Sequence, residues 1–474
     1  MPRLPIALVF ALCLAAAPPL LGSEEATGHG DILVDSPHPL DRKDAARAKF
    51  EALQTTPKVL AQAKLTASEF SFTSRLREFL AGRGTLDFLL ESFLQHSEAG
   101  SALAQDASEQ AVVHETLWIQ ACIPEQVNAL RYEAGRIPIQ DYAQSIAFRL
   151  QAQLALRRTW VPLVQQGTRA GWYHYHFGME HDSSYLPFTA KDLAKEKFQA
   201  TQTTDQELIR KMLAATREQE SERLKEFHGG RGTLDFLIES SVRLAHARLL
   251  ASDNPDERLA SYENLWFACR EIERVNLFRY QDGRIPIQDY AVSRYYRRQA
   301  EIFLREEQTK QGKSRQLMPD SDLPWLFNQD EPNYLKFFAR DKRSLFQASQ
   351  LELQWARVQA ARDSCDGRGR EFLAGRGTLT FLRDSCSRLL DAELAVSDTG
   401  AARLAALDAH WLRTYQIEQV NLGRHLAGRI PTKDYMDSLY QRLDATLWLK
   451  QFLTEKKLPR ATPLRFRLEP RICP

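Results

Sequence analysis

The sequence has no excess of charge of either sign. It contains 63 lysine and arginine residues against 61 aspartate and glutamate residues, which gives a formal net charge of +2. Proteins that bind nucleic acid concentrate positive charge to neutralise the phosphate backbone. The balance of charge therefore argues against nucleic acid as a partner.

Long hydrophobic runs are also lacking. The apolar stretch at 6–17 is shorter than the roughly 20 residues that cross a bilayer. It follows Arg3 and precedes the polar Ser23, which is the pattern of a cleaved secretory signal peptide. We therefore predict a signal peptide at 1–22 and export to the periplasm or the medium. Outer-membrane or peripheral membrane association is the alternative to a freely soluble state.

Short catalytic signatures are missing as well: the chain has no nucleophile elbow, phosphate loop, zincin helix or paired-cysteine metal motif. The one suggestive cluster contains His174, His176 and His181, and imidazoles at such spacing can bind zinc or copper. The alternative, which we favour, is an aromatic linker whose histidines face water. We expect no catalytic residue, no cofactor and no bound metal.

What the sequence does contain is an internal repeat. One motif reads AGRGTLDFL, GGRGTLDFL and AGRGTLTFL, and a second reads GRIPIQDY, GRIPIQDY and GRIPTKDY. The first and second motif glycines are 53 residues apart in every copy, while successive copies are offset by 148 and 145 residues. The glycine pairs are Gly82 and Gly135, Gly230 and Gly283, and Gly375 and Gly428. Such self-similarity is typical of repeat architectures.

Helical periodicity fills the repeats. Leu86, Leu89, Leu90, Phe93 and Leu94 recur at the spacing of one helix face. A polar break lies midway between the motifs in each copy, and we expect the chain to reverse there. These breaks are at 98–100, 253–255 and 398–400. The pattern predicts an all-α fold of three tandem repeats with about four antiparallel helices each, stacked as a solenoid or closed as separate coiled-coil-like bundles.

The predicted domain organisation follows from these motifs. We expect the signal peptide at 1–22 to precede three helical repeats separated by two linkers. The expected segments are repeat 1 at 23–157, a linker at 158–196, repeat 2 at 197–312, a linker at 313–340, repeat 3 at 341–456 and a C-terminal tail at 457–474.

The motif residues are typical of junctions between helices. Glycine closes a helix in the left-handed conformation, threonine caps the next helix, and proline fits a first helical turn. The arginine after each glycine either caps the finished helix and pairs with a following aspartate, or contributes to a row of ligand-binding sites. We favour the structural interpretation for these arginines and for the recurring tryptophans, and we expect the recurring asparagines to bridge helices or face solvent. The tryptophans are Trp118, Trp266 and Trp411, and the asparagines are Asn128, Asn276 and Asn421.

Two cysteines lie at similar distances on either side of one predicted junction. Cys365 precedes Gly375 by ten residues and Cys386 follows it by eleven. If the chain reverses at this glycine, the two side chains lie at the same height on facing helices, where a disulfide is geometrically possible. The other interpretation is two buried free thiols, which the absence of the pair from the other copies favours.

The sequences GRGTLDFLLES and GRIPIQDYAVS resemble the helix-tip sequences of TolC-like outer-membrane efflux proteins. This resemblance implies helical hairpins in the cell envelope, with Gly82 and Gly135 at their turns. Transport is not implied, because the alternating strands that embed such proteins in the membrane are missing from this sequence. We therefore expect a non-enzymatic scaffold that binds other proteins, with a component of an efflux or export system as the alternative.

Overall fold

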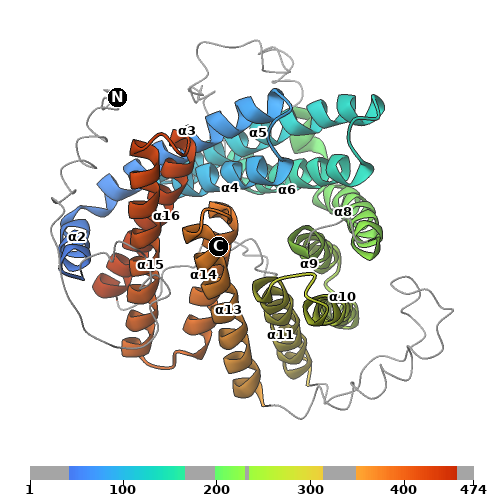
Figure 1. The fold of residues 1–474 in the computed structure, drawn as a ribbon. Helices are drawn as coiled ribbons and strands as arrows, with labels where there is room; N and C mark the ends of the chain where they lie inside the picture. Colours follow the sequence, from blue (N-terminus) through green and yellow to red (C-terminus); the bar gives the residue numbers. More distant parts are fainter. Residues whose placement is uncertain (1–41, 166–197, 230–233, 313–348, 456–474) are drawn as a thin grey trace. The chain divides into compact units, whose positions relative to one another are not determined.

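The fold, taken from a computed structural model, is described for residues 42–165, 198–229, 234–312 and 349–455. Every regular element in these ranges is an α-helix, and no strand occurs among them (Figure 1). The predicted all-α class is therefore confirmed. The predicted signal peptide at 1–22 and the cluster of His174, His176 and His181 lie outside the described residues.

Helices of equal length recur along the chain. The 24-residue helices α3, α8 and α13 span Pro57–Leu80, Asp205–His228 and Gln350–Leu373. The 18-residue helices α4, α9 and α14 span Leu86–Leu103, Leu234–Ala251 and Leu379–Val396. The 27-residue helices α5, α10 and α15 span Ala107–Glu133, Pro255–Gln281 and Gly400–Leu426. Helices α6, α11 and α16 follow at Ile139–Gln165, Ile287–Lys310 and Thr432–Glu455, and α2 spans Arg42–Gln54.

The motif glycines end helices as expected. Their φ angles lie between +65° and +73°, in the left-handed region that glycine enters without a steric penalty. These glycines are Gly82, Gly135, Gly283, Gly375 and Gly428. The proline of the second motif is placed slightly differently from the prediction, because Pro286 is the N-cap of α11 and its first helical residue is Ile287.

The prediction of a turn at 98–100 was wrong. These residues lie inside α4, and the chain reverses after Leu103, where Asp106 caps α5 by accepting hydrogen bonds from the backbone of Ser108 and Glu109. Gly100 serves close packing instead, since a Cβ atom there would lie 3.2 Å from Cγ2 of Val113. The other two predicted breaks, at 253–255 and 398–400, do coincide with helix junctions, and their last residues, Pro255 and Gly400, begin α10 and α15.

The predicted apolar face of α4 is largely correct. Leu86, Leu89, Leu90 and Phe93 are buried, whereas Leu94 is exposed. The buried part of this helix is nevertheless wider than the sequence pattern indicated, because the polar Asp87, Glu91 and Gln95 are buried as well.

Contacts between helices divide the chain into two compact units. Unit 1 comprises the described parts of Met1–Ser74 and Cys365–Ala461, and unit 2 the described parts of Arg75–Ser364. Each unit combines helices from different parts of the sequence, so neither corresponds to one predicted repeat.

In unit 1, α3 packs against α16, although almost the whole chain separates them in sequence (Figure 1). The Lys64 ammonium lies 2.5 Å from a carboxylate oxygen of Asp444, and both side chains are buried. The hydroxyl of Ser71 donates a hydrogen bond to Asp437. The core of the unit lies between α2, α14, α15 and α16 and contains Ala45, Leu390, Leu407, Trp411, Tyr415, Leu449 and Phe452.

In unit 2, α6 packs against α8 in a similar way. Gln219 of α8 donates a hydrogen bond of 3.1 Å to Gln144 of α6. Counted from the two motif glycines, Gln219 and Gln144 occupy the same positions as Ser71 and Asp437 in unit 1. The core between α6, α8 and α9 contains Leu150, Leu154, Leu208, Ile209, Met212 and Ala247.

Candidate functional site

One ion pair recurs at three equivalent places in the chain. In each case a glutamate ten residues before the second motif glycine pairs with an arginine fourteen residues after it. The pair joins two consecutive helices and is only partly exposed. Repetition at equivalent positions is typical of a structural role. The pairs are Glu125 with Arg149, Glu273 with Arg297, and Glu418 with Arg442.

The arginine that caps a finished helix is not the motif arginine that the sequence indicated. Arg131, four residues before Gly135, donates a hydrogen bond of 2.6 Å to the carbonyl of Phe79 and lies 4.6 Å from the centre of its ring. The same contact links Arg279 to Phe227 and Arg424 to Phe372.

Asp141 pairs with Arg223 of α8 at 2.6 Å, so this aspartate joins two helices and was wrongly assigned to the neighbouring motif arginine. Burial raises the pKa of the Asp141 carboxyl, and the Arg223 charge counteracts part of that rise. Asn128 and Asn421 bridge helices by donating to backbone carbonyls, which agrees with one of the two predicted alternatives. The three recurring tryptophans are buried, as predicted for core residues.

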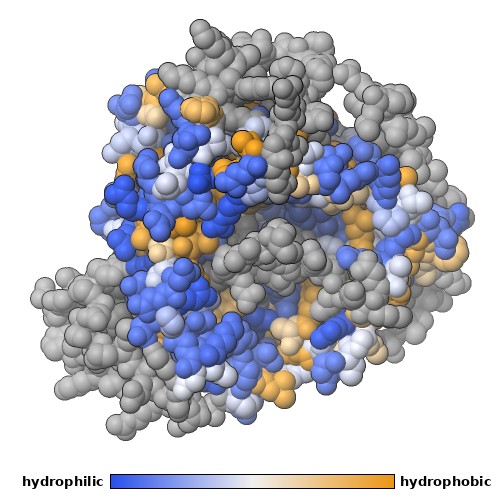
Figure 2. Space-filling view, turned by 180° about the vertical axis from the view of Figure 1, so that it is seen from behind, coloured by the Kyte–Doolittle hydropathy of each residue, from blue (hydrophilic) through white to orange (hydrophobic). Residues whose placement is uncertain are grey.

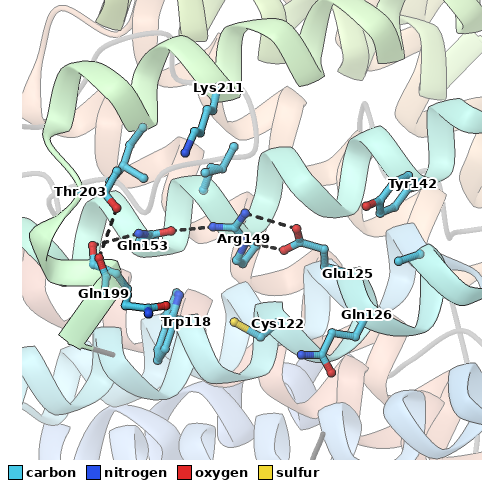
Figure 3. A pocket seen from close by; sticks show the side chains of 14 residues that line it. Trp118, Cys122, Glu125, Gln126, Tyr142, Arg149, Gln153, Gln199, Thr203 and Lys211 are labelled. Carbon is cyan, nitrogen blue, oxygen red and sulfur yellow. Dashed lines mark hydrogen bonds and ion pairs between the residues drawn. The ribbon is translucent and has the colours of Figure 1, made fainter. Parts of the chain in front are cut away.

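A partly open cavity of about 420 Å³ is the candidate binding site in unit 2. It lies between α5, α6, the start of α8 and the helical turn at 198–202 (Figure 3). Trp118, Leu150 and Leu208 supply apolar walls, and Glu125, Arg149 and Lys211 supply charged ones. This mixture of apolar walls and a few polar groups is typical of small-molecule sites.

Most polar groups of α6 in this cavity are already engaged (Figure 3). The Arg149 guanidinium donates to Glu125 at 3.2 Å and to the side-chain oxygen of Gln153 at 2.6 Å. The Gln153 amide nitrogen in turn donates to the carbonyl of Ala200 at 2.9 Å. These bonds hold the cavity wall in a defined geometry and attach the turn at 198–202 to α6.

The indole N–H of Trp118 differs, because it is buried and has no hydrogen-bond acceptor. At the equivalent place in unit 1, Trp411 donates to the Thr446 hydroxyl at 2.9 Å and stacks on Tyr415 at 5.2 Å. Gln153 and Cys122 replace these two residues beside Trp118. The cavity therefore has both a smaller side chain and an unused donor.

The third equivalent tryptophan, Trp266, resembles Trp118 in its indole N–H and Trp411 in having a large side chain against its ring. The Trp266 indole N–H also lacks an acceptor, but the Arg270 guanidinium lies 5.4 Å from the centre of a Trp266 ring. Arg270 occupies the position of Cys122 and Tyr415. The residue thirteen positions before the second motif glycine thus differs in each copy: it is Cys122, Arg270 and Tyr415.

The two cysteines lie together, as the predicted reversal at Gly375 requires. The sulfur atoms of Cys365 and Cys386 are 3.3 Å apart on α13 and α14, and both are buried free thiols. The hydrogen bond between them lowers the pKa of Cys365 and raises that of Cys386. Burial lowers the pKa of His410 to about 3, so this histidine is neutral at physiological pH.

The same interior place holds different chemistry in unit 2. Ser241 donates a hydrogen bond of 3.2 Å to Glu220, at the positions equivalent to Cys386 and Cys365. Burial raises the pKa of Glu220 to about 7. This buried position therefore varies between copies, whereas the helix lengths and the Glu–Arg pairs recur.

No group of three or more histidine, cysteine, aspartate or glutamate side chains among the described residues is arranged to hold a metal ion. Within the same part of the chain, no helix combines the length and apolarity needed to span a membrane. Comparison with protein-family models, with curated proteins and with solved structures finds no match for this chain.

Proposed function

We propose that this protein is an exported, non-enzymatic helical scaffold that binds other proteins of the cell envelope or extracellular space. In this proposal, the scaffold consists of three tandem repeats with four antiparallel helices each. Equal helix lengths at equivalent places support this arrangement. The recurring Glu–Arg pairs support it further, since each connects the third and fourth helix of a proposed repeat.

The contacts of α3 and α16 support a direct pairing of the first and last proposed repeats within unit 1. Ser71 and Asp437 join the first and last proposed repeats through the positions that Gln219 and Gln144 use between the second and first. An open solenoid would leave the outer faces of its first and last helices without such a contact. In the proposed scaffold these faces are therefore used internally, and partners bind elsewhere.

The observation that carries the proposal is the exposure of large apolar side chains at the ends of three equivalent helices. Leu130, Phe278 and Leu426 are 69%, 54% and 68% exposed, near the ends of α5, α10 and α15. Each lies within two residues of an arginine that caps a neighbouring helix, so the backbone beneath it is fixed. Apolar and arginine side chains on a rigid support are typical of protein-binding surfaces. On the face shown in Figure 2, hydrophobic residues are interspersed with hydrophilic ones.

The test is affinity capture from the native envelope with a triple variant, Leu130→Ser, Phe278→Ser and Leu426→Ser. We expect this variant to lose the proteins that the unmodified chain captures reproducibly. The matched control changes three exposed apolar residues on other surfaces, Val59, Val164 and Leu351, to serine and should retain them. Equal capture by both variants would show that the helix ends are not the binding surface.

Fractionation distinguishes the scaffold from the alternative that the TolC-like sequence resemblance suggests. The scaffold should remain in the detergent-free supernatant after signal-peptide removal. Sedimentation with outer membranes that resists high salt and carbonate would favour a component of an efflux or export system instead.

A further inference from the structure

We propose that the cavity beside Trp118 binds a small organic carboxylate that has an apolar body and a second oxygen acceptor. This site is independent of the protein-binding surface proposed above. It belongs to one copy of the repeat, because the side chains that distinguish it from the equivalent place in unit 1 are Cys122 and Gln153.

The first requirement that a ligand must meet comes from the indole N–H of Trp118. The Trp118 side chain lines the cavity and the residue is 2% exposed, yet its N–H has no acceptor within the described part of the chain. Buried donors in proteins are almost always paired, and an unpaired one is unfavourable. The Gln153 oxygen does not serve, because it accepts from Arg149. An acceptor oxygen on a bound molecule would complete this bond.

The second requirement comes from the charge of the walls. Glu125 and Arg149 pair with each other, and the third charged residue of the lining, Lys211, pairs with Glu207. Its ammonium lies 2.8 Å from Glu207, but an ammonium has three donors and that contact uses one. Figure 3 shows Lys211 directed from α8 toward the side chains of α6. The Lys211 side chain is 51% exposed, so a ligand carboxylate can reach it from solvent.

The third requirement comes from the apolar walls and the size of the cavity. Leu150 of α6 and Leu208 of α8 line it, and Cys122 replaces the bulky Tyr415 of the equivalent place. A volume of about 420 Å³ lies in the range of small-molecule sites and accommodates a fused aromatic ring system or a short chain. A ligand with a carboxylate at one end and an oxygen acceptor at the other would bind Lys211 through the carboxylate and the Trp118 indole N–H through the oxygen.

The probe is 6-hydroxy-2-naphthoate, whose binding to the full chain is measured by calorimetry and by saturation-transfer NMR. Two related probes separate its features: 2-naphthoate lacks the second oxygen, and the methyl ester of the hydroxy acid lacks the charge. We expect the complete probe to bind at least about threefold more tightly than either, since each lost hydrogen bond or ion pair contributes modestly.

The decisive variant is Cys122→Tyr with Gln153→Thr, which copies the side chains that fill the equivalent place in unit 1. Because this combination already packs against Trp411 in the same chain, we expect it to fold, with an unchanged circular dichroism spectrum. Binding of the probe should fall by at least about tenfold, because the ring occupies the cavity and the threonine accepts the indole N–H. The control Lys225→Ala removes another exposed lysine of α8 and should bind normally.

Two single variants test the ends of the ligand separately, even if the double variant folds poorly. Trp118→Phe should weaken 6-hydroxy-2-naphthoate more than 2-naphthoate, because both lose apolar contact but only the hydroxy acid also loses the hydrogen bond to the indole. Lys211→Ala should weaken both acids by about fivefold and leave the methyl ester unchanged. Failure of the unmodified protein to bind the probe at millimolar concentration would overturn the proposal, as would equal binding by the folded double variant.

Discussion

Replacing the buried pair of Lys64 and Asp444 one residue at a time should destabilise unit 1 strongly, whereas replacing both should not. The ammonium and the carboxylate are 2.5 Å apart, both side chains are almost fully buried, and the ammonium also lies 4.7 Å from the centre of the Tyr440 ring. Lys64→Met leaves the buried Asp444 charge without its ammonium partner, and Asp444→Leu leaves the buried lysine charge without its carboxylate. Each should cost about 3–5 kcal/mol, the usual penalty for breaking a buried pair.

The double variant Lys64→Met with Asp444→Leu removes both charges and replaces them with apolar groups of similar size. Its stability should return to within about 1 kcal/mol of the unmodified protein or exceed it. The assay is urea unfolding of all four proteins, followed by circular dichroism, with the exposed pair of Arg47 and Glu51 on α2 as a control that should change little. Additive losses in the double variant, or single losses as small as those of the control, would refute the buried interface between α3 and α16.

Three further predictions concern backbone, redox and pH behaviour. Gly428→Ala should lower the stability of the protein by about 1 kcal/mol, because φ at Gly428 is +65°. Gly423→Ala, inside α15, should raise the stability by up to about 1 kcal/mol. Thermal melts that rank the two variants the other way would contradict a helix junction at Gly428. Oxidation should join Cys365 to Cys386 and stabilise the protein by about 3 kcal/mol, which non-reducing peptide mapping and melting test; another pairing would contradict the 3.3 Å contact. Because burial raises the folded-state pKa of Glu220 from 4.5 to about 7, the folded chain retains this proton more tightly, and the resulting stability is lost as pH rises from about 4.5 to about 7. Glu220→Gln should therefore gain stability relative to the unmodified protein across that window, and a pH-independent difference would contradict this.

The helical frame was predictable because local signals specify it. Glycine is tolerated in the left-handed conformation that Gly82 and Gly375 adopt, and tryptophan at a regular interval indicates a buried face. Gly100 misled the prediction because a glycine in a sequence can mark either a turn or a close approach of helices. Its contact with Val113 is a tertiary feature that no local pattern reports.

The side-chain partners were less predictable, for the same reason. Arg131 caps α3 from another helix, whereas the prediction favoured Arg136 because it lies in the repeated motif. The cavity could have been suspected by comparing the copies, since Cys122 stands where the third copy has Tyr415. Whether such a difference leaves a space depends on the neighbouring turn at 198–202, which only the structure places.

The most direct test of the proposed pairing of the first and last repeats is a zero-length crosslink between α2 and the last repeat. Lys49 of α2 lies 2.5 Å from Asp408 of α15, and both side chains are accessible enough for a carbodiimide to couple them. Lys225 and Glu222 on α8, 2.6 Å apart, provide the internal control for reagent activity. At low protein concentration, mass spectrometry of the monomer should detect a Lys49–Asp408 amide that Lys49→Ala abolishes. Formation of the Lys225–Glu222 amide without any link between Lys49 and Asp408 would contradict the account.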